Sequence, residues 1–223
     1  MINILCYGDS NTWGADPLWD RKGIQWRLPA HLRWTGVVQQ NLGDQYHVYE
    51  EGLCNRNTAF DDTLAADCNG LRALPAVLAT THPLDLVIFM LGTNDIKRRF
   101  GLGPMDTFRA AELLINCVRT APCGYIMGMP PKILIVAPVP VSDIAMNYEW
   151  GELFGVAGIE MSKKLPEYLK RVAEKWDCEY LNAGAYAEPN PTDGVHLDAE
   201  NHQKLGLAIA AKIREIFEGQ GTK

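Results

Sequence analysis

Ile2-Asn3-Ile4-Leu5-Cys6-Tyr7-Gly8-Asp9-Ser10-Asn11 is the stretch that decides the fold. The apolar run 2–7 has the length and composition of a buried strand, and the residues that follow turn the chain at its end. Ligands of α/β proteins bind where parallel strands end. A serine at this place can act as a nucleophile if a base reaches it. Ser10 taken alone could equally be a residue that only caps a helix.

The rest of the chain alternates strand-like and helix-like segments. Further apolar runs predict strands over 46–50, 84–91, 132–137 and, more weakly, 178–181. Apolar residues at helical spacing predict helices over 34–42, which Gly43 would end, and over 71–79, 106–119, 159–176 and 199–217. This alternation predicts an α/β fold in which helices cover both faces of a parallel sheet. We expect a three-layer α/β/α sandwich of the flavodoxin-like kind, in one domain spanning 1–223.

Composition and charge exclude several classes of function. The 223 residues carry 21 basic and 27 acidic side chains, a net charge of −6, which argues against nonspecific nucleic-acid binding. No apolar run is long enough to span a bilayer, and the first residues lack the basic region of a signal peptide. The cysteines are scattered and form no CxxC pair, as is typical of reduced thiols. We therefore expect a cytoplasmic protein with no membrane or nucleic-acid partner.

A candidate base for Ser10 lies far along the chain, in Asp193-Gly194-Val195-His196. A carboxylate three residues before a histidine can accept its Nδ1 proton, which leaves Nε2 free to take a proton from serine. The competing interpretation is that Asp193 or Asp198 caps the helix that starts near residue 199. Asp198 suits that cap better, which leaves Asp193 for His196. The other histidines have no motif around them and are expected to be solvated or structural.

A third motif, Gly92-Thr93-Asn94-Asp95, follows the apolar run 84–91. The Asn94 amide could donate to an oxyanion together with backbone N–H groups, although an Asn-Asp turn with local hydrogen bonds would explain the same residues. The acidic residues Asp61, Asp62 and Asp95 have no histidine or cysteine at ligand spacing, so we expect no metal site. The chain has neither a dinucleotide-binding nor a P-loop glycine pattern, and we expect no cofactor.

These three motifs resemble blocks I, III and V of the SGNH (GDSL-type) hydrolases, over essentially the whole chain. Beyond the motifs, the segments 4–14, 33–37, 50–53 and 84–95 are similar to the bacterial arylesterase/acyltransferase branch. The resemblance implies Ser10 as nucleophile, His196 as base and Asp193 as the residue that orients it. It also implies an oxyanion hole of the Ser10 and Asn55 backbone N–H groups and the Asn94 side chain.

Two positions depart from the family pattern. Most members have glycine or alanine where this chain has Asn55, but a backbone donor survives that change and asparagine tolerates unusual φ angles. Position 11 is often leucine and is Asn11 here, so we expect a pocket wall of different polarity.

Two segments, 15–33 and 138–158, break the strand–helix rhythm and carry more apolar residues than exposed loops need. These residues are Trp19, Trp26, Met146, Tyr148, Trp150 and Phe154. An apolar patch of that size usually marks an interaction surface, and the arylesterase/acyltransferase branch forms closed homo-oligomers. We therefore expect a homo-oligomer larger than a dimer. The alternative is that both segments fold back as a lid on their own chain.

The sequence thus predicts a serine esterase that hydrolyses small aryl or short-chain acyl esters through an acyl-serine intermediate, with acyl transfer to alcohols as a further activity. A carbohydrate O-acetyl esterase would use the same residues. A non-catalytic binding protein that kept the fold is a third interpretation, which the intact set of Ser10, Asp193 and His196 disfavours.

Overall fold

The fold is built on a five-stranded parallel sheet with the strand order β2-β1-β3-β4-β5. The computed structural model describes residues 1–18, 26–126 and 128–219. Its strands are β1 (Ile2–Gly8), β2 (Tyr46–Gly52), β3 (Leu86–Met90), β4 (Lys132–Ala137) and β5 (Glu179–Asn182). The predicted strands and the α/β class are confirmed, although the strand expected over 84–91 is shorter at both ends.

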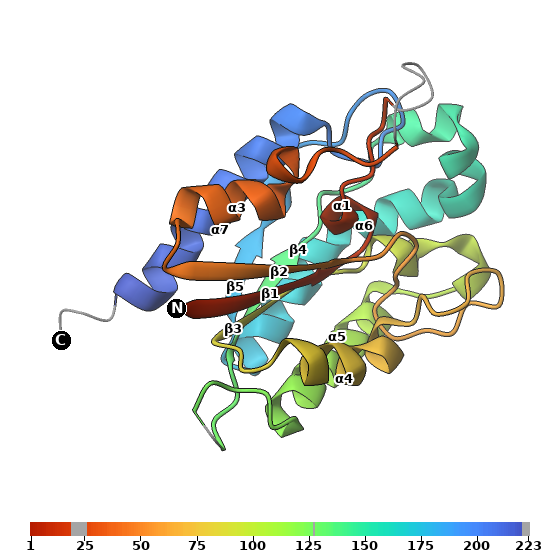
Figure 1. Cartoon of the computed structure of the whole chain (residues 1–223). Coiled ribbons are helices and arrows are strands. Elements are labelled where there is room, and N and C mark those ends of the chain that lie inside the picture. Colours follow the sequence, from red (N-terminus) through yellow and green to blue (C-terminus); the bar gives the residue numbers. More distant parts are fainter. Residues whose placement is uncertain (19–25, 127, 220–223) are drawn as a thin grey trace.

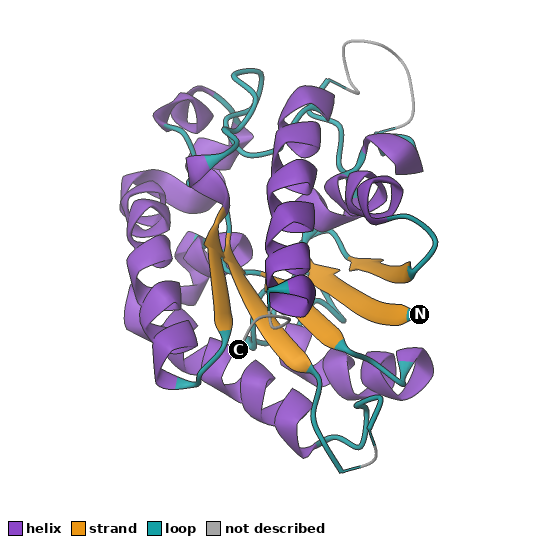
Figure 2. Cartoon of the chain, turned by 90° about the vertical axis from the view of Figure 1, so that its left-hand side faces the viewer, coloured by secondary structure: helices purple, strands orange, loops and turns teal. Residues whose placement is uncertain are grey.

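Helices cover both faces of the sheet and complete the three layers (Figures 1 and 2). One face packs against α3 (Trp34–Leu42) and α7 (Ala199–Glu218), and the other against α4 (Gly70–Thr81), α5 (Pro104–Thr120) and α6 (Glu149–Lys175). Side chains of one strand alternate between the layers. In β1, Leu5 and Tyr7 join the core under α4 and α5, whereas Ile4 and Cys6 join the core under α3 and α7. The inner strands β1, β3 and β4 are therefore apolar on both faces, which is why their runs were readable from sequence.

Local caps set the ends of several helices. Gly43 ends α3 with φ of 76°, as expected. Asn69 begins α4 by accepting a hydrogen bond from the Arg72 N–H at 3.1 Å. Asp198 caps α7 by accepting the Asn201 N–H at 2.9 Å, so the interpretation that gave this cap to Asp198 rather than Asp193 is confirmed.

The segment expected to be irregular over 138–158 is partly helical, and this prediction was wrong. A short 3₁₀ helix covers Asp143–Asn147, and α6 then begins at Glu149, ten residues earlier than the predicted start at 159. Gly155 interrupts it with φ of 65°, a left-handed conformation that favours glycine. Gly158 packs so closely on the Ile96 carbonyl that an added Cβ would lie 2.5 Å from that oxygen. These glycines weaken the helical pattern in the sequence.

The first irregular segment, 15–33, is described only in part. Ala15 forms an isolated antiparallel bridge with Arg27, and the Trp26 ring packs on the Trp13 ring at 4.3 Å between centroids. Trp19 lies outside the described residues. In the described part of the chain, no helix combines the length and the apolar character needed to cross a membrane.

Candidate active site

The candidate site lies where the strand order reverses. The strand β1 has β2 on one side and β3 on the other, and in doubly wound sheets ligands bind at such a switch point, beyond the carboxyl ends of the strands. Ser10 follows β1 as the first residue of the short helix α1 (Ser10–Trp13). Asn94 follows β3 in the 3₁₀ helix η2 (Thr93–Ile96). The topology therefore brings two of the predicted motifs to one edge of the sheet.

Ser10, His196 and Asp193 form one hydrogen-bonded chain. The Ser10 Oγ lies 3.0 Å from His196 Nε2, and His196 Nδ1 lies 2.6 Å from Asp193 Oδ2. A carboxylate only accepts hydrogen bonds, so the imidazole proton belongs on Nδ1 and Nε2 is left to accept from the serine. This is the arrangement in which histidine can take a proton from a serine nucleophile.

The turn that carries His196 is held by Asp193 itself. The other carboxylate oxygen, Oδ1, accepts the N–H groups of Val195 at 2.8 Å and His196 at 2.9 Å. Gly194 sits in this turn with φ of 73°, where its carbonyl accepts the Ser142 N–H at 2.8 Å. The backbone N–H groups of this turn thus fix the Asp193 carboxylate, which in turn orients the imidazole of His196.

Asn11 holds the His196 segment from the other side. Its Nδ2 donates to the Val195 carbonyl at 3.3 Å, and its Oδ1 accepts the Leu197 N–H at 3.0 Å. The side chain is buried, with the residue 4% exposed, and it is not among the described residues that line the pocket. The expectation that Asn11 changes the polarity of a pocket wall was therefore wrong: it clamps the residues on either side of His196.

The two remaining predicted oxyanion residues lie on segments that are bonded to each other. Asn94 is buried, and its Nδ2 donates to the Arg56 carbonyl at 3.1 Å, which leaves one amide hydrogen for another acceptor. The next residue, Asp95, accepts the Thr58 N–H at 2.8 Å. Asn55 has φ of 68°, the left-handed region that asparagine tolerates better than most residues. Ser10, Asn55 and Asn94 all line one pocket.

Two buried carboxylates next to the motif residues have raised pKa values. Burial raises the pKa of Asp9 to about 6, against the opposing effects of the Asn11 N–H and of His196. Burial likewise raises the pKa of Asp95 to about 6, against the hydrogen bond from Thr58. Both groups serve local structure, since Asp9 caps α1 and Asp95 holds the 56–58 segment. Their perturbed pKa values mark the low-dielectric surroundings of the site.

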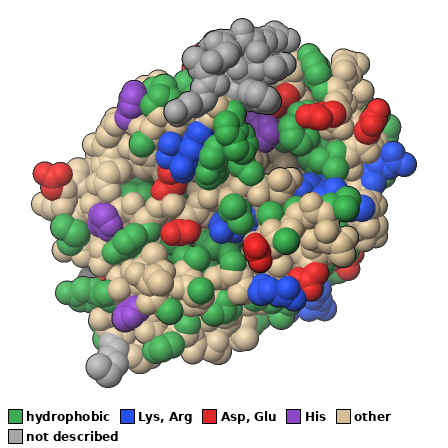
Figure 3. All heavy atoms as spheres, turned by 45° about the vertical axis from the view of Figure 1, so that its right-hand side comes forward, with side chains coloured by type: hydrophobic (Ala, Val, Ile, Leu, Met, Phe, Trp, Pro, Cys, Tyr) green, Lys and Arg blue, Asp and Glu red, His purple; other side chains and the backbone are tan. Residues whose placement is uncertain are grey.

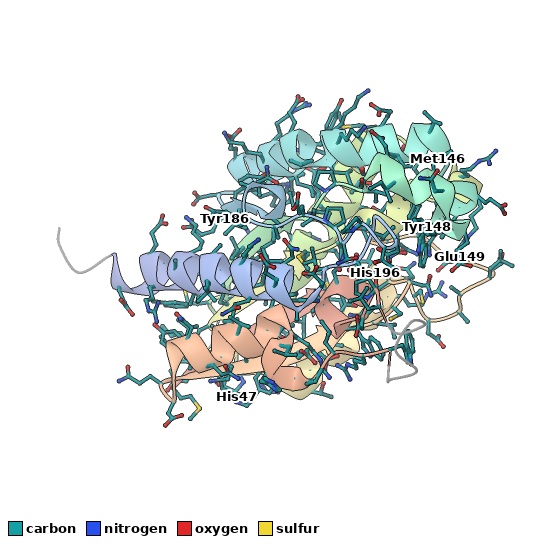
Figure 4. All side chains as sticks on the ribbon, turned by 90° about the horizontal axis from the view of Figure 1, so that it is seen from above. His47, Met146, Tyr148, Glu149, Tyr186 and His196 are labelled. Carbon is teal, nitrogen blue, oxygen red and sulfur yellow. The ribbon has the colours of Figure 1, made fainter. Side chains whose placement is uncertain are left out.

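The pocket above Ser10 has a volume of about 380 Å³. Part of its wall is aromatic: Trp150 meets the His196 ring edge-on at 5.3 Å between centroids and stacks with Phe154 at 6.2 Å. Trp26 and Tyr148 also line it and are 50% and 39% exposed. Figure 4 shows Tyr148 and Glu149 on the same side of the molecule as His196.

The residues of the expected apolar patch thus divide into two groups. Phe154 is only 1% exposed and Trp150 is partly buried, and both close the pocket of their own chain, as in the lid alternative. Trp26, Met146 and Tyr148 remain on the surface. Figure 3 shows hydrophobic side chains mixed with acidic and basic ones on the face that it presents.

Two buried cations near the site were not singled out from the sequence. Arg56 donates through Nη1 to the Gly8 carbonyl at 3.0 Å and lies over the Tyr7 ring at 4.0 Å. Lys97 donates through Nζ to Asn55 Oδ1 at 3.0 Å. The sequence gives a signal for either residue only through its neighbours. Arg56 directly follows Asn55, and Lys97 comes shortly after the motif that contains Asn94.

The other predictions about single residues concern histidine and metal. His202 is structural, since its Nδ1 accepts the Trp34 N–H at 3.1 Å and joins α7 to α3. Burial lowers the pKa of His202 to about 3, so it is neutral near pH 7. Within 1–18, 26–126 and 128–219, no three or more histidine, cysteine, aspartate or glutamate side chains lie close enough together to hold a metal ion.

Comparisons with known proteins place this geometry among ester hydrolases. Residues 6–204 match the model of the GDSL-like lipase/acylhydrolase family. The structure of the native M. smegmatis aryl esterase is similar, with 37% identity, coverage of 97% of this chain and 100% of that one, and a TM-score of 0.89. A carbohydrate acetylesterase from Sinorhizobium meliloti is similar at 40% identity, the same coverage and a TM-score of 0.89. A search of curated proteins found no match.

Proposed function

The chain belongs to the GDSL-like lipase/acylhydrolase family and is a carboxylic ester hydrolase; from this premise we propose that it cleaves small aryl and short-chain acyl esters through an acyl-Ser10 intermediate. The observation that supports this most directly is the chain of hydrogen bonds from Ser10 Oγ to His196 Nε2 at 3.0 Å and from His196 Nδ1 to Asp193 at 2.6 Å. It lies at a pocket of about 380 Å³, a volume suited to a small ester.

In this mechanism, His196 Nε2 takes the proton of Ser10 as Oγ attacks the ester carbonyl carbon. The carbonyl oxygen becomes an oxyanion, which receives hydrogen bonds from the Ser10 and Asn55 backbone N–H groups and from Asn94 Nδ2. His196 then protonates the leaving alcohol as the acyl-Ser10 ester forms. Water attacks that ester in the second half, with His196 again as base, and releases the acid. Asp193 stabilises the imidazolium in both halves.

A carbohydrate O-acetyl esterase is the second candidate function. It is supported by the similarity to the S. meliloti carbohydrate acetylesterase and by two carboxylates at the pocket, Asp16 and Glu149, which can accept hydrogen bonds from sugar hydroxyls. A panel of aryl acetates and acetylated sugars separates the two candidates by kcat/KM. Activity on aryl acetates at least tenfold above that on acetylated sugars would favour the arylesterase.

We also propose acyl transfer from Ser10 to alcohols. The aromatic wall formed by Trp150 and Phe154 gives an entering alcohol apolar contact that water cannot use. Added alcohol should therefore divert the acyl group to a new ester while the rate of release of the first alcohol stays the same or rises. If only free acid forms at any alcohol concentration, the transferase activity is absent.

Assembly and compartment belong to the same proposal. Trp26 and Tyr148 line the pocket and are exposed, and Met146 is also exposed; these residues would form part of an interface in a homo-oligomer larger than a dimer. All six cysteines are free, which fits a reducing compartment such as the cytoplasm.

The test of the nucleophile uses Ser10→Ala, His196→Ala and the double variant. Each single change should lower kcat on an aryl acetate by about 10⁴ to 10⁶, and the double variant should lose little more, because the residues act as a unit. A fluorophosphonate should add its mass to the peptide that contains Ser10, and exhaustive chelation should leave the rate unchanged.

His47→Ala is the matched control. This histidine is exposed and lies away from His196 (Figure 4), so its removal should leave the activity intact. A folded Ser10→Ala variant that keeps more than a tenth of the wild-type kcat would rule out the acyl-Ser10 mechanism.

A further inference from the structure

Lys97 is a buried lysine beside the proposed oxyanion hole. Only 1% of its surface is exposed, although lysine is almost never fully buried unless it is paired. Its Nζ donates to the side-chain oxygen of Asn55 at 3.0 Å, an amide rather than a carboxylate. Lys97 directly follows η2, the 3₁₀ helix that carries Asn94. Lys97 therefore connects the segment that carries Asn94 to the segment that carries Asn55, the two proposed oxyanion residues that lie outside α1.

Asn55 needs such support because of its backbone. Its φ of 68° places it in the left-handed region, which is most favourable for glycine, even though asparagine tolerates it better than most residues. Asn55 is also exposed to the pocket, so little packing holds its side chain. The hydrogen bond from Lys97 fixes the amide of Asn55, and through it the orientation of the peptide whose N–H is the proposed donor.

We propose that Lys97 is a positioning residue for ester hydrolysis, which holds Asn55 in its left-handed conformation through a charge-assisted hydrogen bond. The inference rests on the proposed function, because it assumes that an oxyanion forms beside Asn55. A backbone N–H donor that is preorganised in this way stabilises developing negative charge without reorganisation of the surroundings. Lys97 would thus act on the transition state more than on substrate binding.

The groups around Lys97 determine when it is charged. Burial and the neighbouring Arg99 lower the pKa of Lys97 to about 8, against the opposing effects of Asp62, Cys68 and Asp9. Asp62 is bonded to Arg99, whose side chain holds the pKa of that carboxyl below its ordinary value. Burial raises the pKa of the Cys68 thiol above its ordinary value. Lys97 is therefore the group in this cluster that loses a charge near pH 8.

The first experiment compares Lys97→Met with wild type on a neutral aryl acetate at pH 7. Methionine keeps the apolar stem and removes both the charge and the donor. We expect kcat to fall about tenfold, with KM changed less than threefold, and Lys97→Arg to recover part of kcat. Lys170→Met is the matched control, because Lys170 is exposed on α6 and should not affect kcat.

The second experiment asks whether Lys97 acts through Asn55. Asn55→Gly keeps the backbone donor and tolerates positive φ, but it removes the acceptor of Lys97. If Lys97 acts through Asn55, Lys97→Met should lower kcat in the wild-type background and have almost no further effect in Asn55→Gly. Equal factors in both backgrounds would overturn the inference. Asn55→Gly changes only a pocket-facing residue. If Lys97→Met does not fold, the pH profile of Asn55→Gly still tests the role of Lys97.

The third measurement is the alkaline limb of kcat, after subtraction of the rate of Ser10→Ala. Wild type should lose activity as the pH rises through about 8, where Lys97 deprotonates, and both Lys97→Met and Asn55→Gly should lack this limb. A wild-type profile that stays flat to pH 9.5, or a Lys97→Met kcat within twofold of wild type, overturns the role of Lys97. If Ser10→Ala itself stays active, the proposed function fails instead.

Discussion

At the scale of single residues, the site depends on side chains whose hydrogen bonds are divided between structure and chemistry. Asn94 gives one amide hydrogen to the Arg56 carbonyl and has one left for the proposed oxyanion. Asp193 uses one carboxylate oxygen for backbone N–H groups and the other for His196. Each residue is thus fixed by one contact and can act through another.

Asn94→Ala tests the side-chain donor. Loss of one oxyanion donor typically lowers kcat by about 10² to 10³, and KM should change much less because the bond strengthens as charge develops. Steady-state kinetics on a short aryl ester measures both, with Asn116→Ala, on an exposed face of α5, as the control. A loss expressed only in KM would mean that Asn94 binds the ground state and does not stabilise the oxyanion.

Asn11→Ala tests the clamp on the His196 segment. The change leaves the buried Leu197 N–H without its acceptor, which should lower the free energy of unfolding by about 1–3 kcal/mol. We expect kcat to fall roughly tenfold, as the position of His196 loosens. Urea unfolding and kinetics on the same preparation check both effects. Unchanged kcat in a destabilised variant would limit Asn11 to a structural role.

At the scale of elements, a buried carboxylate joins two helices of one layer. Glu112 of α5 accepts hydrogen bonds from Lys175 of α6, from the Trp176 indole at 2.9 Å and from Arg109 at 2.8 Å. Burial alone would raise the pKa of Glu112, but these donors outweigh it and lower the pKa to about 2. An ionised Glu112 therefore contributes to the α5–α6 contact, beside the apolar packing of the two helices.

Glu112→Gln should reveal this contact through its pH dependence. The pKa of Glu112 is about 2 in the folded protein and near 4.5 in the unfolded chain. The ionised carboxylate therefore stabilises the fold above pH 4.5, and this contribution to the free energy of unfolding is lost as the pH falls toward 2. At pH 7 the variant should be less stable by about 1–3 kcal/mol. The difference from wild type should shrink between pH 5 and pH 3.5, as measured by denaturant unfolding. A constant difference across that range would contradict the assignment.

The elements also show where sequence patterns were sufficient. The strands β1, β3 and β4 are buried on both faces, so their apolar runs predicted them directly. The first turns of α6 were missed because Gly151, Gly155 and Gly158 dilute the helical pattern, and the close packing that they allow is not visible locally. The contact of Lys97 with Asn55 joins residues 42 positions apart. Only the folded chain shows such a pair, whereas the short motifs located Ser10, Asn94, Asp193 and His196.

At the scale of the whole molecule, assembly is the open prediction. Light scattering of the active protein in dilute solution should give a mass above twice the 24.8 kDa of one chain. Tyr148→Glu places a charge at an exposed aromatic residue and should lower that mass if the surface is an interface. A fully active particle with the mass of one chain would contradict the proposed oligomer. Trp26, Met146 and Tyr148 would then be interpreted as part of a lid.

The distance along the chain between Ser10 and His196 has a consequence for biosynthesis. The two residues lie 186 positions apart, and at about 5–20 residues per second a ribosome needs roughly 10 to 40 s to pass from one to the other. During that time the emerging chain carries an ordinary hydroxyl, because no imidazole is in place to deprotonate it. Under the proposed acyl-Ser10 mechanism, the nascent polypeptide therefore does not react with cellular esters at Ser10 before α7 and the turn preceding it have docked on the sheet.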